Sequence, residues 1–132
     1  MKVRELMSTD VAIVARNDTL TVADDIMSKQ RIRHLPVLEG GRLVGILTQR
    51  DLFHAGLSTA MGFGQKAQKD FLVTVPVKEV MTDEVVTIGP DEDVKVAARI
   101  MLERKIGCLP VVDSGKLVGL LSESDFLRLV AE

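Results

Sequence analysis

The chain has 132 residues, which is enough for one compact domain or for two very small ones. Its 46% hydrophobic and 27% charged residues are typical of a folded globular protein, and a net charge of −2 excludes a broadly basic nucleic-acid-binding surface. No apolar run approaches the roughly 20 residues that span a bilayer, the charged N-terminus does not resemble an export signal, and a single cysteine excludes an internal disulfide. We therefore expect a cytoplasmic protein with no membrane and no nucleic-acid partner.

An internal repeat organises the chain. Residues 3–54 align with residues 77–128 without a gap, and 18 of the 52 aligned pairs are identical. Self-similarity over this length indicates a duplication. We expect repeat 1 at residues 1–56, a partly helical linker at residues 57–76 and repeat 2 at residues 77–132.

In chain order, each copy is predicted to form a strand, a helix, two further strands and a last helix. In the second copy the first strand covers residues 85–88, a short β-branched run that Gly89 and Pro90 end. The helix that follows has an N-cap candidate in each copy, Thr19 in the first and Asp93 in the second.

The next two strands are predicted to form a β-hairpin in each copy. Apolar runs flank turn residues at positions 39–42 in the first copy and 113–116 in the second. The last helix of the second copy starts at Ser122 and carries three apolar residues at helical spacing, namely Phe126, Leu127 and Val130.

The residues do not indicate an enzyme or a metal centre. The two histidines, His34 and His54, occupy unrelated positions in the repeat, and Cys108 is most simply a small buried thiol. No Cys/His spacing matches a metal site, and neither a phosphate-binding Gly-rich loop nor a nucleophile elbow is present. We expect no catalysis, no metal and no required cofactor.

One short motif recurs in both copies, at residues 45–51 and 119–125: a glycine, two apolar residues, a hydroxyl residue, two variable positions and an aspartate. A hydroxyl followed three residues later by a carboxylate is typical of a helix capping box. The same arrangement suits a ligand, because a hydroxyl at a helix start can bind a phosphate and a carboxylate can accept from both ribose hydroxyls. The glycine would leave room for close approach. The motif alone leaves both interpretations open.

The duplicated unit resembles the cystathionine-β-synthase (CBS) domain, in its apolar-Pro-Val run before the turn and in the glycine-to-aspartate motif after it. The resemblance covers nearly the whole chain outside the linker. It implies an α/β fold of two tandem β-α-β-β-α repeats packed through their sheets with pseudo-twofold symmetry, a stand-alone CBS pair or Bateman module. Such modules commonly bind AMP, ADP, ATP or related adenosyl ligands in two clefts between the repeats, and they often dimerise.

The resemblance also implies the residues of the two clefts. Each cleft would combine the hydroxyl and carboxylate of one copy, for phosphate and ribose, with adenine-enclosing residues of the other. The first cleft would use Thr48, Asp51, Thr82, Val86 and Ile106, and the second Ser122, Asp125, Ser8, Ala12 and Ile32.

Arg33 distinguishes the two copies, because Gly107 occupies its position in the second. Members of the family often reach the phosphates with a basic side chain from this place. Arg31, two residues earlier, is better explained as a cation at a helix end.

We therefore expect a non-catalytic, energy-sensing regulatory module, a homodimer that binds AMP, ADP or ATP and modulates an unidentified partner protein. The alternatives are a ligand-free dimerisation or interaction module, and a module that binds another adenosyl ligand such as S-adenosylmethionine or NAD.

Overall fold

A computed structural model describes residues 1–60 and 72–132 of the chain, which divides into two compact units. The central unit is Ala12–Val85, and the terminal unit combines Met1–Val11 with Val86–Glu132. The N-terminal segment therefore belongs to the same unit as most of the second sequence repeat.

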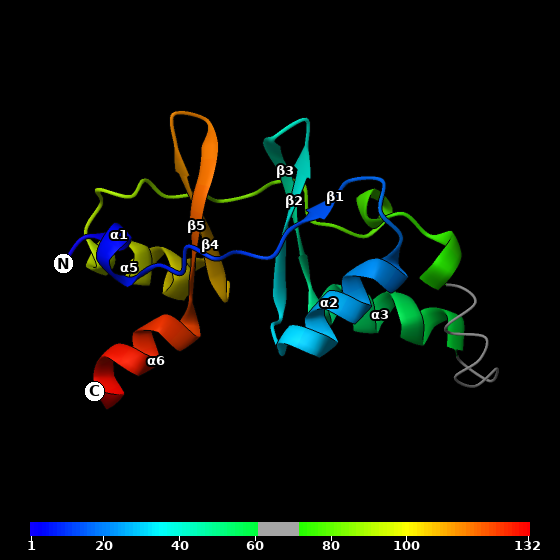
Figure 1. Cartoon of the computed structure of the whole chain (residues 1–132). Coiled ribbons are helices and arrows are strands. Elements are labelled where there is room, and N and C mark those ends of the chain that lie inside the picture. The colour runs from blue at the N-terminus through cyan, green and yellow to red at the C-terminus, as the bar shows by residue number, and fades with distance from the viewer. Residues whose placement is uncertain (61–71) are drawn as a thin grey trace. The chain divides into compact units, whose positions relative to one another are not determined.

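In the central unit, a small sheet carries two helices (Figure 1). Strand β2 lies in the middle of the sheet, parallel to β1 and antiparallel to β3. Of the linker predicted at residues 57–76, residues 61–71 lie outside the described part. The elements are β1 (Val14–Ala15), α2 (Leu20–Gln30), β2 (His34–Glu39), β3 (Arg42–Thr48), α3 (Gln49–Ala60) and the 3₁₀ turn η1 (Val77–Glu79).

In the terminal unit, the antiparallel strands β4 and β5 form a hairpin, and the N-terminal helix α1 contacts β5, α5 and α6 (Figure 1). Together with the central unit it makes a mixed α/β chain with two tandem repeats of the same elements, as predicted. The elements are α1 (Val3–Leu6), α5 (Val94–Arg104), β4 (Cys108–Asp113), β5 (Lys116–Ser122) and α6 (Glu123–Ala131).

The strand predicted at residues 85–88 is reduced to a single parallel bridge between Ile88 and Val111. Its counterpart in the central unit, β1, continues because the N–H of Arg16 donates to the carbonyl of Leu38 at 3.1 Å. Pro90 stands at the position that corresponds to Arg16 and has no N–H to donate, so the ladder does not continue beyond Ile88. Residues 85–87, which come before Ile88, form no ladder.

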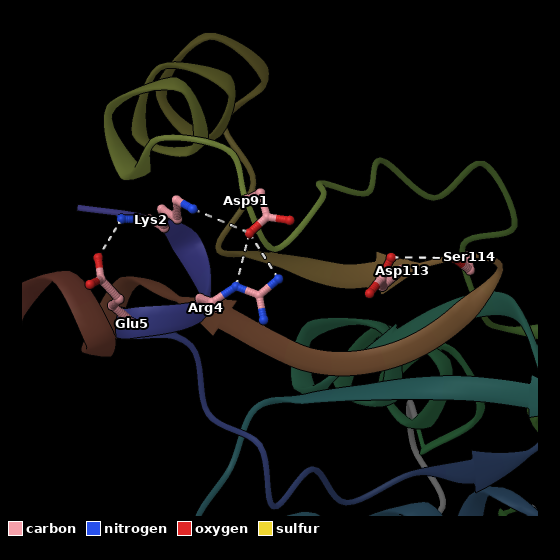
Figure 2. Close-up of polar contacts among 6 residues, drawn as sticks. All are labelled: Lys2, Arg4, Glu5, Asp91, Asp113 and Ser114. Atoms are coloured by element: carbon pink, nitrogen blue, oxygen red, sulfur yellow. Dashed lines mark hydrogen bonds and ion pairs between the residues drawn. The ribbon is translucent and has the colours of Figure 1, made fainter.

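Both predicted hairpins are confirmed. Their two-residue turns adopt positive φ at both positions, 57° and 81° at Gly40 and Gly41, and 52° and 81° at Ser114 and Gly115. Such turns match the right-handed twist of the flanking strands. The hydroxyl of Ser114 donates to the Asp113 carboxylate at 3.4 Å, which can be followed in Figure 2.

The helix starts differ between the copies. Asp93 caps α5 as predicted, because its carboxylate accepts from the N–H of Lys95 at 2.8 Å. Thr19 occupies the N-cap position of α2 as predicted, but its side chain makes no cap hydrogen bond, and its backbone pairs with Pro76.

Each unit buries its own cluster of apolar side chains, and most members of the two clusters occupy corresponding positions of the repeat. The opening segment of each repeat is the exception, because it packs in the unit of the other repeat; we call these two the exchanged segments. Val3 from the first repeat belongs to the cluster of the terminal unit, and Val77 from the second repeat belongs to that of the central unit. Shared positions in the central cluster are Val14, Leu20, Ala23, Met27, Leu35, Val37 and Leu47, and in the terminal cluster Ile88, Val94, Ala97, Met101, Leu109, Val111 and Leu121.

The exchanged segments are held by equivalent backbone hydrogen bonds. The N–H of Val3 donates to the Glu92 carbonyl at 2.8 Å, and the N–H of Val77 donates to the Asp18 carbonyl at 2.7 Å. The two donors occupy corresponding positions of the repeat, as do the two acceptors, so the duplication extends to how each opening segment is bound.

Side chains add to this attachment in the terminal unit. Arg4 and Lys2 both turn toward Asp91, with the Arg4 guanidinium 2.8 Å from the carboxylate (Figure 2). The hydrogen bond from Arg4 is the largest cause of a lowered pKa of Asp91. Desolvation opposes it, and the charges of Arg4 and Lys2 add to the lowering. These groups are solvent-exposed, so burial of Val3 contributes more to binding the segment than they do.

Candidate ligand-binding site

The glycine of the recurring motif packs against the exchanged segment. A Cβ on Gly45 would lie 2.5 Å from Met81 Sδ and 3.0 Å from the Thr82 carbonyl oxygen. On Gly119 it would lie 2.5 Å from Met7 Sδ and 2.9 Å from the Ser8 carbonyl oxygen. The room left by each glycine is therefore filled by the protein's own chain.

Backbone pairing then brings the predicted site residues of the loops to the end of each hairpin. Thr82 exchanges two hydrogen bonds of 2.9 Å with Ile46, two residues before Thr48. Ser8 exchanges hydrogen bonds of 3.0 and 2.9 Å with Leu120, two residues before Ser122. Each hydroxyl-bearing loop residue is thus held beside the motif of its unit.

In the central unit, Thr48 and Asp51 form a reciprocal capping box at the start of α3. The N–H of Thr48 donates to Asp51 Oδ2 at 2.9 Å, and the N–H of Asp51 donates to Thr48 Oγ1 at 3.0 Å. Both side chains are half-buried. We call Thr48, Asp51 and the neighbouring Thr82 the Asp51 cluster.

In the terminal unit, Ser122 and Asp125 form the corresponding capping box at the start of α6. Asp125 is only 2% exposed, and its carboxylate also accepts from Ser8 Oγ at 3.4 Å and pairs with the guanidinium of Arg128. We call Ser8, Ser122, Asp125 and Arg128 the Asp125 cluster. Sequence reasoning missed Arg128, although its spacing of three residues from Asp125 on a helix is a recognisable signal for an ion pair.

The capping interpretation of the motif is therefore confirmed in both copies. It does not exclude a ligand, because a capping box engages only part of a carboxylate that offers about four acceptor positions.

Arg33 lies at the same end of the central unit as the Asp51 cluster. Its carbonyl accepts from the N–H of Gln49, the first residue of α3, at 2.9 Å, and its side chain is exposed. In the terminal unit the equivalent bond joins Gly107 to Glu123 at 3.1 Å. The start of α3 thus has the positively charged Arg33 and the neutral Gln49. The start of α6 has Gly107, which has no side chain, and the negatively charged Glu123.

The residues expected around adenine are half-buried and pack against the core of their own unit. Ala12 and Ile32 lie in the central unit, and Val86 and Ile106 lie in the terminal unit. Each pair belongs to the unit opposite the carboxylate assigned to it, so their common clefts stay a prediction. Arg31 forms the C-cap of α2, as the helix-end interpretation requires.

The remaining candidates for chemistry do not gather at either cluster. Cys108 is buried, and loss of hydration together with the charge of Glu123 raises the pKa of its thiol to about 12. Within residues 1–60 and 72–132, no three His, Cys, Asp or Glu side chains are placed to hold a metal ion. None of the helices in that same part of the chain combines the length and apolarity needed to cross a bilayer.

The repeated elements and their motif identify the class of protein. The family model of the CBS domain matches residues 3–58 and again residues 77–132, so the chain belongs to the CBS-domain family and carries a CBS pair. CBS pairs are generally regulatory modules without catalysis of their own.

Known proteins of similar size have the same organisation. The chain is 35% identical over 123 residues to the CBS domain-containing protein YhcV of Bacillus subtilis, covering 93% of this chain and 81% of YhcV. A structure of AcuB from Vibrio cholerae, named for acetoin utilization, superposes with a TM-score of 0.84 at 33% identity, covering 99% of this chain and 90% of that one. The CBS pair of MJ0100, solved in complex with 5′-methylthioadenosine and S-adenosyl-L-methionine, gives 0.77 at 30% identity, covering 99% and 96%.

Some relatives are much longer than this chain. It spans 24% of a homoserine O-acetyltransferase from Methanosphaerula palustris, at 32% identity over 130 residues. The similarity to that enzyme is thus confined to a segment the size of a CBS pair.

Proposed function

We propose that this CBS pair is a cytoplasmic energy sensor, which binds AMP, ADP or ATP and thereby modulates a partner protein. The observation that carries the proposal is that the carboxylate of Asp51 is only partly occupied by hydrogen bonds within the protein. Among the residues that the structure describes, the N–H of Thr48 is the one donor to its carboxylate, and it reaches Oδ2. Oδ1 of a half-buried carboxylate is then available to the paired hydroxyls of a ribose.

The Thr48 hydroxyl suits the phosphate end of such a ligand. Its oxygen accepts from the Asp51 N–H, so its own hydrogen can be donated to an anion. The first turn of α3 supplies further N–H groups and the positive end of the helix dipole.

Arg33 adds a positive charge at the same helix start. A guanidinium is well suited to a phosphate because it can donate two parallel hydrogen bonds. The complex of MJ0100 with two adenosyl compounds supports the choice of an adenosine-containing ligand. S-adenosylmethionine, which lacks phosphates, is the alternative, and NAD is another.

Calorimetric titration of the wild type with adenosine, AMP, ATP and S-adenosylmethionine tests the proposal. Replacement of Asp51 by Ala should weaken nucleotide binding roughly 10- to 100-fold, since hydrogen bonds to a charged group contribute about 1.5–3 kcal/mol. Arg33→Ala should leave adenosine affinity unchanged and weaken AMP and ATP increasingly with their charge, most strongly at low salt.

Asp93→Ala is the matched control, because Asp93 also caps a helix but lies outside both clusters. It should cost about 0.5–2 kcal/mol of folding stability with no change in affinity. If the wild type binds a nucleotide but Asp51→Ala behaves like Asp93→Ala, Asp51 only caps its helix and the site assignment is wrong. If the wild type binds none of the four ligands, the sensor proposal is wrong and a ligand-free interaction module takes its place.

We also propose that the module is a homodimer through the outer face of α6. Phe126 packs on the core of its unit, whereas Leu127 and Val130 are 68% and 83% exposed in the single chain. Light scattering should return twice the 14.4 kDa chain mass, and Leu127→Glu with Val130→Glu should return the monomer. Leu102→Glu, on the 78% exposed Leu102 of α5, is the control that should leave the dimer intact, and a wild-type monomer would refute the dimer.

A further inference from the structure

We infer that Arg128 is a built-in competitor for the ligand at the Asp125 cluster, so that the two clusters bind adenosyl ligands with unequal affinity. The inference rests on the proposed function and assigns a role to a side chain that lies outside the recurring motif. It concerns the regulation of one site by an ion pair within its own helix.

The carboxylate of Asp125 is fully engaged by the protein. Its Oδ2 accepts from the N–H of Ser122 at 2.8 Å and from the Ser122 hydroxyl at 3.3 Å. Its Oδ1 accepts from the Ser8 hydroxyl at 3.4 Å and from the guanidinium of Arg128. Four donors thus meet a group with about four acceptor positions, and a ribose hydroxyl can bind only if one of them leaves.

The Asp51 cluster differs in the side chains that could donate hydrogen bonds to the aspartate. Asp51 accepts from the Thr48 N–H alone within the described residues, and His54 stands where the repeat places Arg128 in the second copy. Thr82 stands in the place of Ser8. The two clusters therefore share the capping box and differ in how many acceptor positions remain.

Arg128 is the donor that can leave at the lowest cost. Its side chain is 63% exposed, so water replaces the lost interaction, whereas Asp125 is almost completely buried. The ion pair therefore lowers the fraction of molecules in which Asp125 is ready to bind, and apparent affinity falls by that fraction. Added salt weakens an exposed ion pair, so an uncharged ligand should bind the Asp125 cluster better at high salt.

The test uses 5′-methylthioadenosine, whose lack of phosphate prevents a released Arg128 from binding it as an anion. Calorimetry of Asp51→Ala reports on the Asp125 cluster alone, and adding Arg128→Gln should raise its affinity roughly fivefold, the upper range for an exposed pair. The reciprocal variant is built on Asp125→Ala, where adding His54→Arg supplies the competitor to the Asp51 cluster and should lower affinity by a similar factor.

The wild type provides a second measurement that needs no aspartate replacement. It should titrate as two unequal sites, and Arg128→Gln alone should bring the two affinities closer together. Two equal wild-type sites that Arg128→Gln leaves unchanged would overturn the inference while the proposed function stands. If neither the wild type nor any variant binds 5′-methylthioadenosine, AMP or ATP, the proposed function fails and the role of Arg128 fails with it.

Discussion

Gly119 and Met7 lie so close together that a Cβ on the glycine would stand 2.5 Å from the methionine sulfur. The residues come from opposite ends of the sequence and belong to one unit. Gly45 and Met81 have the same relationship in the other unit. The glycine of the motif therefore allows a neighbouring segment to approach the strand.

Gly119→Ala should destabilise the protein by about 1–3 kcal/mol, since the added methyl group forces Met7 and the Ser8 carbonyl to move. Urea unfolding measures the loss. Gly89→Ala is the control, because its nearest contact would be Glu92 Cγ at an ordinary 3.9 Å. Equal stability of the two variants would show that the close approach is not required.

Val3→Ala should cost about 1.5–3 kcal/mol of unfolding free energy, because Val3 is completely buried in the terminal cluster. Val96→Ala makes the same chemical change at a site that is 37% exposed on α5 and should have little effect. The comparison uses chemical denaturation. A harmless Val3→Ala would contradict the assignment of the N-terminal segment to this unit.

Lys105→Gly should stabilise the protein by about 0.5–1 kcal/mol. Lys105 ends α5 at φ 55°, a left-handed conformation that costs an ordinary residue about 1–2 kcal/mol, part of which the greater freedom of unfolded glycine offsets. Glu103→Gly, two residues earlier in the helix, should instead destabilise by about 1 kcal/mol. Thermal unfolding of both variants decides the sign.

Cys108 should react very slowly with iodoacetamide at pH 9, because burial raises the pKa of its thiol from 9.0 to about 12. The folded state binds the proton more tightly, so this group's contribution to stability is full below pH 9 and is lost as pH rises toward 12. Alkylation followed by mass spectrometry measures the rate, with urea-unfolded protein as the reactive control. Equal rates in the folded and unfolded protein would contradict the burial of the thiol.

Local spacing in the sequence was sufficient to predict the duplication, the hairpin turns at Gly41 and Gly115, the cap at Asp93 and the motif that ends at each aspartate. Apart from the duplication, which the self-alignment of the sequence shows, these features depend on interactions between residues a few positions apart, so the sequence is sufficient to predict them. The β-branched run at residues 85–88 predicted a longer strand than forms, because only Ile88 pairs with the neighbouring strand, whereas its end before Pro90 was predicted correctly.

The tertiary structure alone decided which segments meet. Val3 and Val77 are equivalent in the alignment, yet each packs with a hairpin from the other sequence repeat. The pattern of apolar residues in the sequence does not show which hairpin each of them contacts. The same holds for the aspartates, which the sequence shows as identical. Asp125 differs from Asp51 because Ser8, more than a hundred residues away, and Arg128 converge on it. Ser8 reaches Asp125 only through the tertiary structure, since hydrogen bonding depends on distances in space, whereas Arg128 lies one helical turn away and could have been found from its spacing.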